Sequence, residues 1–268
     1  DAIIKVDAHA VIPEDFVSKN VRVLETGEYI CGGQRPNIID KPTPFKETLL
    51  LAESSMFGSS IASYRNNPGK TYVKSLFHAA YRREVFEKVG FFNEELVRTE
   101  DNEIHYRMRK AGYKLCFDPD IISYQYTRSS LKAMLKQKYA NGYWIGKTSK
   151  VCPKCLSIYH FVPFAFVSAI IASGSVIGAT GLAECIKKRH NHTLGKGISA
   201  LRKVTVVLTT VMWVLYALMA SGMAAVSAFK AEDKRNITNA CLPVLFLLLH
   251  LSYGIGTIAG LMDKSKRG

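Results

Sequence analysis

Charged side chains are absent from three long stretches of this 268-residue sequence. No Asp, Glu, Lys or Arg occurs in the windows 156–183, 204–229 and 237–262. Each window reaches the roughly 20 apolar residues that a helix needs to cross about 30 Å of hydrocarbon. These windows argue against a wholly soluble protein. They predict a soluble-type domain over 1–150 and a membrane domain with about three transmembrane helices over 151–268.

Cysteine is sparse, and its spacing excludes further classes. Six cysteines are scattered along the chain, and only Cys152 and Cys155 form a CxxC pair, with no second pair and no histidines at zinc spacing. With 48% hydrophobic residues, the chain is neither a disulfide-stapled miniprotein nor disordered. A redox or zinc-binding pair is possible in principle. We interpret the two as reduced thiols at the mouth of the first membrane helix, which suits a cytosolic first domain.

Positive charge is in excess, with 36 Lys and Arg against 22 Asp and Glu and a formal net charge of +14. Twelve of the basic residues lie between or after the apolar windows, where Lys and Arg commonly flank membrane helices. The others are mixed with carboxylates in the first domain. We therefore expect contact with membrane lipids and no nucleic-acid partner.

The first 150 residues alternate between strand and helix patterns, which predicts an α/β layer fold. In chain order, strands are expected at 2–8, 21–24, 29–31, 77–81 and 114–117, and helices from 13 onward and at 47–57, 84–89, 99–110 and 129–139. Thr99 is a good helix N-cap, and Gly112 is expected to stop the same helix. There is no internal repeat.

The first candidate site is Asp7-Ala8-His9 at a strand end. Side chains two apart on a strand share a face. A carboxylate and an imidazole at a strand's carboxyl end can hold a divalent ion and a phosphate-bearing ligand. The alternative is an ordinary surface turn.

The second candidate is the acidic helix start at Thr99-Glu100-Asp101-Asn102-Glu103. Three carboxylates there could simply complement the helix dipole. The functional alternative is a general base that takes a proton from an attacking hydroxyl.

The third candidate is an aromatic group before the first membrane window, formed by Gln137, Tyr139, Gly142, Tyr143 and Trp144. Rings beside a side-chain amide suit sugar stacking and hydrogen bonding. They also suit an interfacial aromatic belt, and the two functions are compatible.

Together these residues resemble family 2 glycosyltransferases, in particular the bacterial membrane enzymes of succinoglycan and exopolysaccharide biosynthesis. Asp7-Ala8-His9 lies where that family carries Asp-x-Asp. The matching segments are VGFFNEELVRTEDNEIHYRMRKAGYKL (89–115), FHAAYRREVFEKVG (77–90), RSSLKAMLKQKYANGYW (128–144) and LHLSYGIGTIAGL (249–261).

The resemblance implies a GT-A fold, a nucleotide-sugar donor, Mg²⁺ or Mn²⁺, and a lipid-linked or polysaccharide acceptor. Asp7 would bind the metal or the donor diphosphate with His9, and Asp101 would be the base. Glu100 would shape the acceptor site, and Gln137 and Trp144 would correspond to the family's Gln-x-x-Arg-Trp motif. These assignments imply inversion at the anomeric carbon.

The sequence departs from the family pattern in two motifs. His9 replaces the second carboxylate of Asp-x-Asp. The spacing from Gln137 to Trp144 is longer than in the family motif and the Arg is replaced, so processive polymerisation is not supported. Because the family's nucleotide-binding strands precede Asp-x-Asp, we also expect this chain to be a fragment that lacks them.

Two other functional classes compete with an enzyme. A catalytically inactive, membrane-anchored partner subunit or scaffold of a polysaccharide-synthesis complex would keep the fold. A small transporter is disfavoured because the apolar windows lack the charges that commonly mark ion or substrate paths.

The expected location is the inner (plasma) membrane, multi-pass, with the catalytic domain cytosolic. Three spans would put the basic segment 184–203 outside, against the positive-inside tendency. A re-entrant or interfacial hairpin at 156–183 is the alternative. We expect three spans.

Overall fold

The computed structural model describes all residues except 9, 59–68, 190–194, 232, 234 and 266–268. Its strands are β1 (Ala2–Ile4), β2 (Ala10–Val11), β3 (Ile30–Gln34), β4 (Asn37–Ile38), β5 (Thr71–Val73), β6 (Ala80–Arg82), β7 (Leu115–Ile122) and β8 (Tyr124–Tyr126). Its helices are α1 (Phe16–Glu25), α2 (Pro44–Ser54), α3 (Arg83–Val89), α4 (Glu100–Lys110), α5 (Leu131–Val151), α6 (Val162–Arg189), α7 (Lys196–Lys230) and α8 (Leu242–Met262). Short 3₁₀ turns are η2 (Pro153–Cys155), η3 (Ile158–Phe161) and η5 (Ile237–Cys241).

The first part of the chain folds around a five-stranded mixed sheet in the order β1-β6-β3-β7-β5. Within this sheet, as far as the structure describes it, β3 and β7 pair in parallel and the other neighbours pair antiparallel. A second sheet, β2-β8-β4, lies beside it. The expected α/β class is confirmed.

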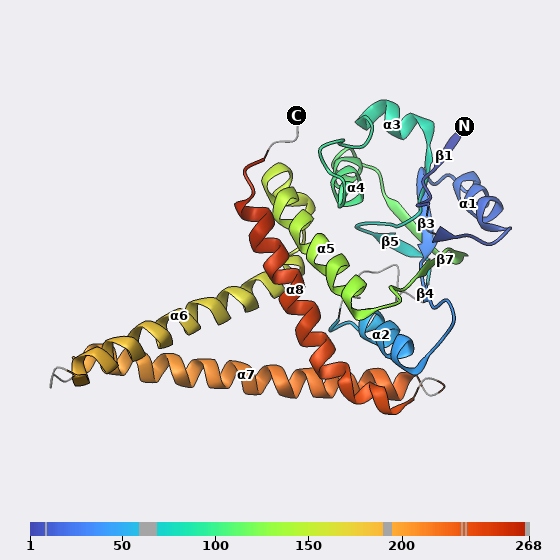
Figure 1. Cartoon of the computed structure of the whole chain (residues 1–268). Coiled ribbons are helices and arrows are strands. Elements are labelled where there is room, and N and C mark those ends of the chain that lie inside the picture. Colours follow the sequence, from blue (N-terminus) through green and yellow to red (C-terminus); the bar gives the residue numbers. More distant parts are fainter. Residues whose placement is uncertain (9, 59–68, 190–194, 232, 234, 266–268) are drawn as a thin grey trace.

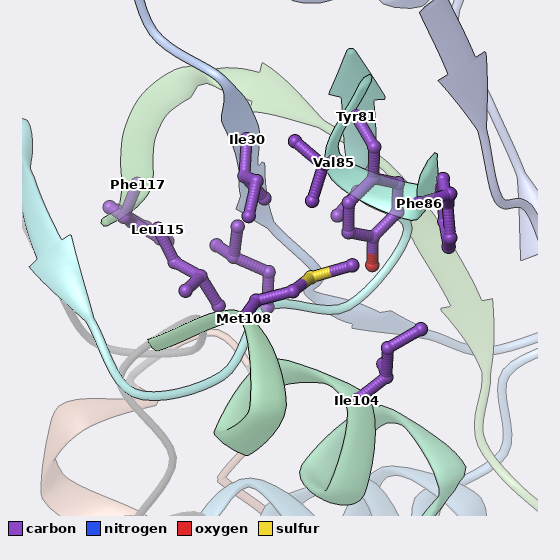
Figure 2. Packing of buried hydrophobic residues seen from close by; sticks show 10 residues of the cluster. Ile30, Tyr81, Val85, Phe86, Ile104, Met108, Leu115 and Phe117 are labelled. Carbon is purple, nitrogen blue, oxygen red and sulfur yellow. The ribbon is translucent and has the colours of Figure 1, made fainter. Parts of the chain in front are cut away.

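Alternation along the strands divides the core into two layers. Ile30, Tyr81 and Phe117 pack with α3 and α4 on one face (Figure 2). Their chain neighbours Cys31, Ala80 and Cys116 pack with α1 on the other face. This is the period-two pattern of a strand that is covered on both sides.

The strand expected at 2–8 ends at Ile4. Two other expected strands are corrected by tertiary contacts. Residues 21–24 continue helix α1, whose buried residues fall at helical spacing and cover the sheet: Phe16, Asn20, Val23 and Leu24. Strand β3 continues through Gly32-Gly33 instead of ending there. A Cβ on Gly33 would lie 2.0 Å from the carbonyl oxygen of Ile121 in β7, so close backbone approach explains this glycine.

Helix α5 runs to Val151, well beyond the expected end near residue 139. It lies beside α8 (Figure 1), and the two helices meet through backbone contacts at glycine. A Cβ on Gly146 would lie 2.5 Å from the Thr257 carbonyl oxygen, and one on Gly260 would lie 2.0 Å from that of Tyr143. Each of these two glycines ends a GxxxG sequence, the pattern that lets helix backbones approach closely.

Helices α6 and α7 form a long hairpin that points away from the sheet (Figure 1). Three described helical segments are long and apolar enough to cross a membrane: 158–189, 196–230 and 237–262. Residues 162–189 form one unbroken helix, not the alternative hairpin considered for 156–183.

Candidate functional site

The pairing of β1 with β6 builds one wall of the site. After Ile4 pairs with Ala80, the Lys5 amide donates to the Ala79 carbonyl oxygen at 3.0 Å. The chain therefore leaves the sheet with Lys5 and Asp7 next to His78. His9 lies outside the described residues, so its expected metal-binding role has no structural description.

Helix α4 supplies the opposite wall. Its N-cap is Thr99, as expected, but with φ 69°, in the left-handed region. The Thr99 hydroxyl shares a hydrogen bond with the hydroxyl of Thr148 on α5, so the expected capping role of its side chain is not seen. The turn brings Glu100 and Asp101 to the end of β1.

Lys5 joins the three acidic side chains into one cluster. Its Nζ donates to Asp101 Oδ1 at 2.7 Å and to Glu100 Oε1 at 3.0 Å, and it lies 3.9 Å from Asp7 Oδ1. The Asp7 side chain also faces His78, whose Nε2 is 3.8 Å from Asp7 Oδ2. The structure thus brings Asp7 together with the adjacent carboxylates Glu100 and Asp101, which follow it by more than 90 residues in the sequence.

Burial sets the ionisation of the cluster. The Asp101 side chain is 17% exposed. Burial raises the pKa of Asp101 to about 6, against the opposing effect of the Lys5 ammonium, and the neighbouring Glu100 and Asp7 carboxylates add to the rise. For Lys5, burial by itself lowers the pKa, but the carboxylates of Asp101 and Glu100 outweigh it and the net pKa is raised. A carboxyl group that titrates near neutral pH can accept a proton from a substrate and release it again.

Helix α5 presents a polar stripe to the segment that precedes Asp101. Asn141 accepts a hydrogen bond from Arg98 Nη1 at 2.9 Å, and the hydroxyls of Thr148 and Thr99 are hydrogen-bonded to each other. Gln137 and Trp144 fall at helical spacing on this same stripe, so all four side chains share one face. Trp144 is 9% exposed, and Gln137 Oε1 is a buried atom without a hydrogen-bond partner in the described part of the chain.

Two residues of the site were not expected from the sequence. Lys5 precedes Asp7 by two positions, so strand alternation alone could have placed both on one face. His78 is a polar residue within the apolar run Leu76 to Tyr81. Its proximity to Asp7 depends on a strand pairing that joins distant segments.

Metal ligands do not form a large cluster in the described chain. No group of three or more His, Cys, Asp or Glu side chains is close enough to hold an ion there. The pair of Asp7 and His78 has the appropriate donor atoms for one. Cys152 and Cys155 are both free thiols, and burial raises the pKa of Cys155 to about 12.

Curated proteins that match the chain are sugar-transfer and polysaccharide proteins. Succinoglycan biosynthesis protein ExoA of Rhizobium meliloti (strain 1021) is 27% identical over 145 residues, covering 53% of this chain and 43% of that protein. Dolichyl N-acetyl-alpha-D-glucosaminyl phosphate 3-beta-D-2,3-diacetamido-2,3-dideoxy-beta-D-glucuronosyltransferase of Methanococcus voltae is 24% identical over 64% of this chain and 54% of its own length. O-antigen chain rhamnosyltransferase WbaN of Salmonella anatum is 32% identical over 38% of this chain and 30% of its length.

The chain thus spans about half or less of the relatives that it matches. The model of the family described as "Glycosyl transferase family group 2" matches residues 2–256, which include the sheet, the acidic cluster and most of the apolar helices. The mixed sheet is consistent with the GT-A fold that the resemblance implied. The chain therefore belongs to glycosyl transferase family group 2.

Proposed function

We propose that the protein containing this chain is an inverting glycosyltransferase that uses a nucleotide-sugar donor. The acceptor is a lipid-linked sugar or a growing polysaccharide. The names of the relatives, which include succinoglycan biosynthesis and O-antigen chain rhamnosyl transfer, support this substrate class. The observation that carries the proposal is the buried Asp101 carboxyl, with a pKa near 6, between Lys5 and the start of α4.

In this proposal Asp101 is the general base. Its carboxylate takes the proton of an acceptor hydroxyl, and the acceptor oxygen forms a bond to the anomeric carbon of the sugar. The bond from that carbon to the diphosphate oxygen breaks on the opposite side, so the configuration inverts. At neutral pH a group with a pKa of about 6 is mostly ionised and still basic enough to take the proton.

Glycosyltransferases of this family generally use divalent metals. Asp7 would hold Mg²⁺ or Mn²⁺, and the facing nitrogen of His78 fits this assignment because it is a second donor 3.8 Å away. When bound, such an ion offsets the negative charge of the departing diphosphate. Lys5 keeps the neighbouring carboxylates from repelling one another.

The stripe on α5 is proposed to bind sugars. Trp144, although only 9% exposed, would stack against a sugar ring, and Gln137 Oε1, a buried atom without a hydrogen-bond partner among the described residues, would accept from a sugar hydroxyl. Glu100 lies one residue before the base and would contact the acceptor. Arg98 and Thr99 tie this stripe to the base segment, so acceptor binding and proton transfer share one framework.

The proposed location is the cytosolic face of the inner membrane, with multiple passes. At about 1.5 Å per residue, α6 and α7 are roughly 42 and 52 Å long, enough to cross about 30 Å of hydrocarbon. Their basic tip then lies outside, an exception to the positive-inside tendency.

The test is sugar transfer by the complete protein in detergent or nanodiscs, with nucleotide sugars as donors and a membrane lipid extract as acceptor. Asp101→Asn should lower transfer by about 10²–10⁴-fold, the usual size of a general-base effect. Asp120→Asn, at an exposed carboxylate on β7, should leave transfer unchanged. Product NMR should show the opposite anomeric configuration to that of the donor.

Two results would contradict the proposal. Full transfer by Asp101→Asn would remove the base assignment. Absence of transfer by the wild-type protein with every common nucleotide sugar would favour the inactive partner subunit.

A further inference from the structure

His78 is buried and conformationally unusual. It is 4% exposed and has φ 29°, in the left-handed region that residues other than glycine seldom adopt. Its Nε2 makes no hydrogen bond to any described residue and points toward Asp7 Oδ2, 3.8 Å away. A buried polar atom without a hydrogen bond and a strained backbone each cost free energy, and both features concentrate at functional sites.

The hydrogen bonds around the ring favour a proton on Nδ1. Ser123 Oγ donates to the Gln34 carbonyl oxygen at 3.4 Å, so its lone pair is available to accept from His78 Nδ1–H, 2.8 Å away. With the proton on Nδ1, Nε2 carries a lone pair. A histidine that donates its other ring N–H to a neighbouring group is the usual arrangement of a metal ligand, because the bond fixes both the tautomer and the ring.

We propose that His78 Nε2 and the Asp7 carboxylate are the two protein ligands from β6 and β1 that hold the divalent ion. Two ligands that are each about 2.1 Å from an octahedral ion lie about 3.0 Å apart when adjacent and about 4.2 Å apart when opposite. The observed 3.8 Å matches neither spacing, so the two side chains would have to shift by about 0.4–0.8 Å relative to each other to bind one ion. Water and the diphosphate complete the shell, as is common where the protein supplies few ligands.

A nitrogen ligand also bears on which ion is bound. Mg²⁺ prefers oxygen ligands, whereas imidazole suits transition ions. We therefore infer a preference for Mn²⁺ over Mg²⁺ at this site. This inference deepens the proposed function and rests on it, but its test reads metal binding with no donor or acceptor present.

The experiment uses the complete protein in detergent with Mn²⁺ alone. Because His9 is a second imidazole in the same motif, every comparison is made in a His9→Ala background. Electron paramagnetic resonance measures free Mn²⁺, and pulsed measurements detect ¹⁴N coupled to the bound ion. The parent should show ¹⁴N coupling, and an excess of Mg²⁺ should displace Mn²⁺ poorly.

His78→Ala should abolish the ¹⁴N coupling and weaken Mn²⁺ binding by at least the roughly 10–100-fold that loss of a supporting partner costs. His78→Asp should bind Mn²⁺ without ¹⁴N coupling, which keeps the test valid if the alanine variant does not fold. His160→Ala removes an imidazole in η3 and should change neither signal.

Persisting ¹⁴N coupling in His78→Ala, or unchanged Mn²⁺ affinity in both His78 variants, would overturn the inference. These outcomes differ from failure of the proposed function. A protein that transfers no sugar can still show the ¹⁴N coupling, which would support the ligand assignment while removing the role of Asp101.

Discussion

Helices α7 and α8 contain equally apolar windows but have different surroundings. The most apolar windows of both segments have a mean hydropathy of 1.9, yet 6% of the window in α7 is buried and 39% of that in α8. Leu242, Leu245, Phe246 and Leu249 of α8 pack in one cluster with α2, α5 and α7. Hydropathy therefore identifies a helix that avoids water, but it does not show whether lipid or protein covers that helix.

Both ends of α8 contact the α/β part of the chain. Just before it, Asn239 Oδ1 accepts from Thr48 of α2 at 2.7 Å. Just after it, Asp263 lies 3.4 Å from Lys147 Nζ of α5, and its carboxylate also accepts from Tyr143. A helix across the bilayer would have its ends about 30 Å apart on opposite sides. In place of the three spans expected from the sequence, we therefore expect the α6–α7 hairpin to cross and α8 to lie along the membrane surface.

The largest expected effect is all or none: it is the side of the membrane from which a cysteine at each helix end can be labelled. In single-cysteine variants treated with a membrane-impermeant maleimide, Cys241 before α8 and Ser265→Cys after it should react from the same side of the membrane. Cys185, near the far end of the α6 helix, should react from the other side. Reaction of Cys241 and Ser265→Cys from opposite sides would show that α8 crosses as a third span.

The next largest effect is on stability, where a methyl group added to α8 and one added to α7 should have different effects. Gly260→Ala places a Cβ 2.0 Å from the Tyr143 carbonyl oxygen, so α5 and α8 must move apart, at a cost of about 1–3 kcal/mol of unfolding free energy. Gly222→Ala is the matched control, because, apart from its chain neighbours and the adjacent backbone of its own helix, no described atom lies within 4 Å of its Cβ. In α7 this change should be neutral or slightly stabilising, since alanine favours helix over glycine.

Thermal unfolding in detergent measures both variants. Equal melting temperatures for Gly260→Ala and Gly222→Ala would mean that α8 is held no more tightly than α7.

The ionisation of Asp101 should depend on Lys5 and not on the packing of α5 against α8. The Lys5 ammonium lowers the pKa of Asp101 by its charge and its hydrogen bond, so Lys5→Met should raise that pKa above about 6. Because the base acts when ionised, the acid limb of the kcat/KM profile should move to higher pH, with activity lost near pH 6–7 and recovered toward pH 8. Lys5→Arg and Gly260→Ala should keep the wild-type limb.

An unchanged acid limb in Lys5→Met would mean that Lys5 does not control the ionisation of the base. A matching shift in Gly260→Ala would mean that the site depends on the α5–α8 contact.

The sequence predicted local features better than the contacts between distant segments. The helix expected at 99–110 is found at Glu100–Lys110, because the acidic first turn and the glycine that follows its last turn are local signals. The end of α5 at Val151 could not be predicted in this way, because packing against Gly256 and Gly260 of α8 extends it.

The same limit applies to the candidate site. Asp7, Glu100 and Asp101 were candidates because each lies in a recognisable local pattern. Lys5 and His78 gain their roles from the pairing of β1 with β6 and from the turn before α4. The contacts of Lys5 with Asp101 and of His78 with Asp7 join distant segments, so no local pattern encodes them.

The smallest expected effect concerns the connection from α8 through α5 to the base. Thr148 is fully buried, and its hydroxyl holds Thr99 two residues before Asp101. Thr148→Val keeps the shape and removes the hydrogen bond, worth about 0.5–1.5 kcal/mol. We expect kcat to fall by roughly 2- to 10-fold with the donor KM unchanged, because the base loses its position while the donor contacts stay.

The control is Thr210→Val in α7, whose hydroxyl bonds only its own helix among the described residues. This variant should leave kcat unchanged. Equal kcat values for the two variants would mean that α5 supports the site without positioning its base.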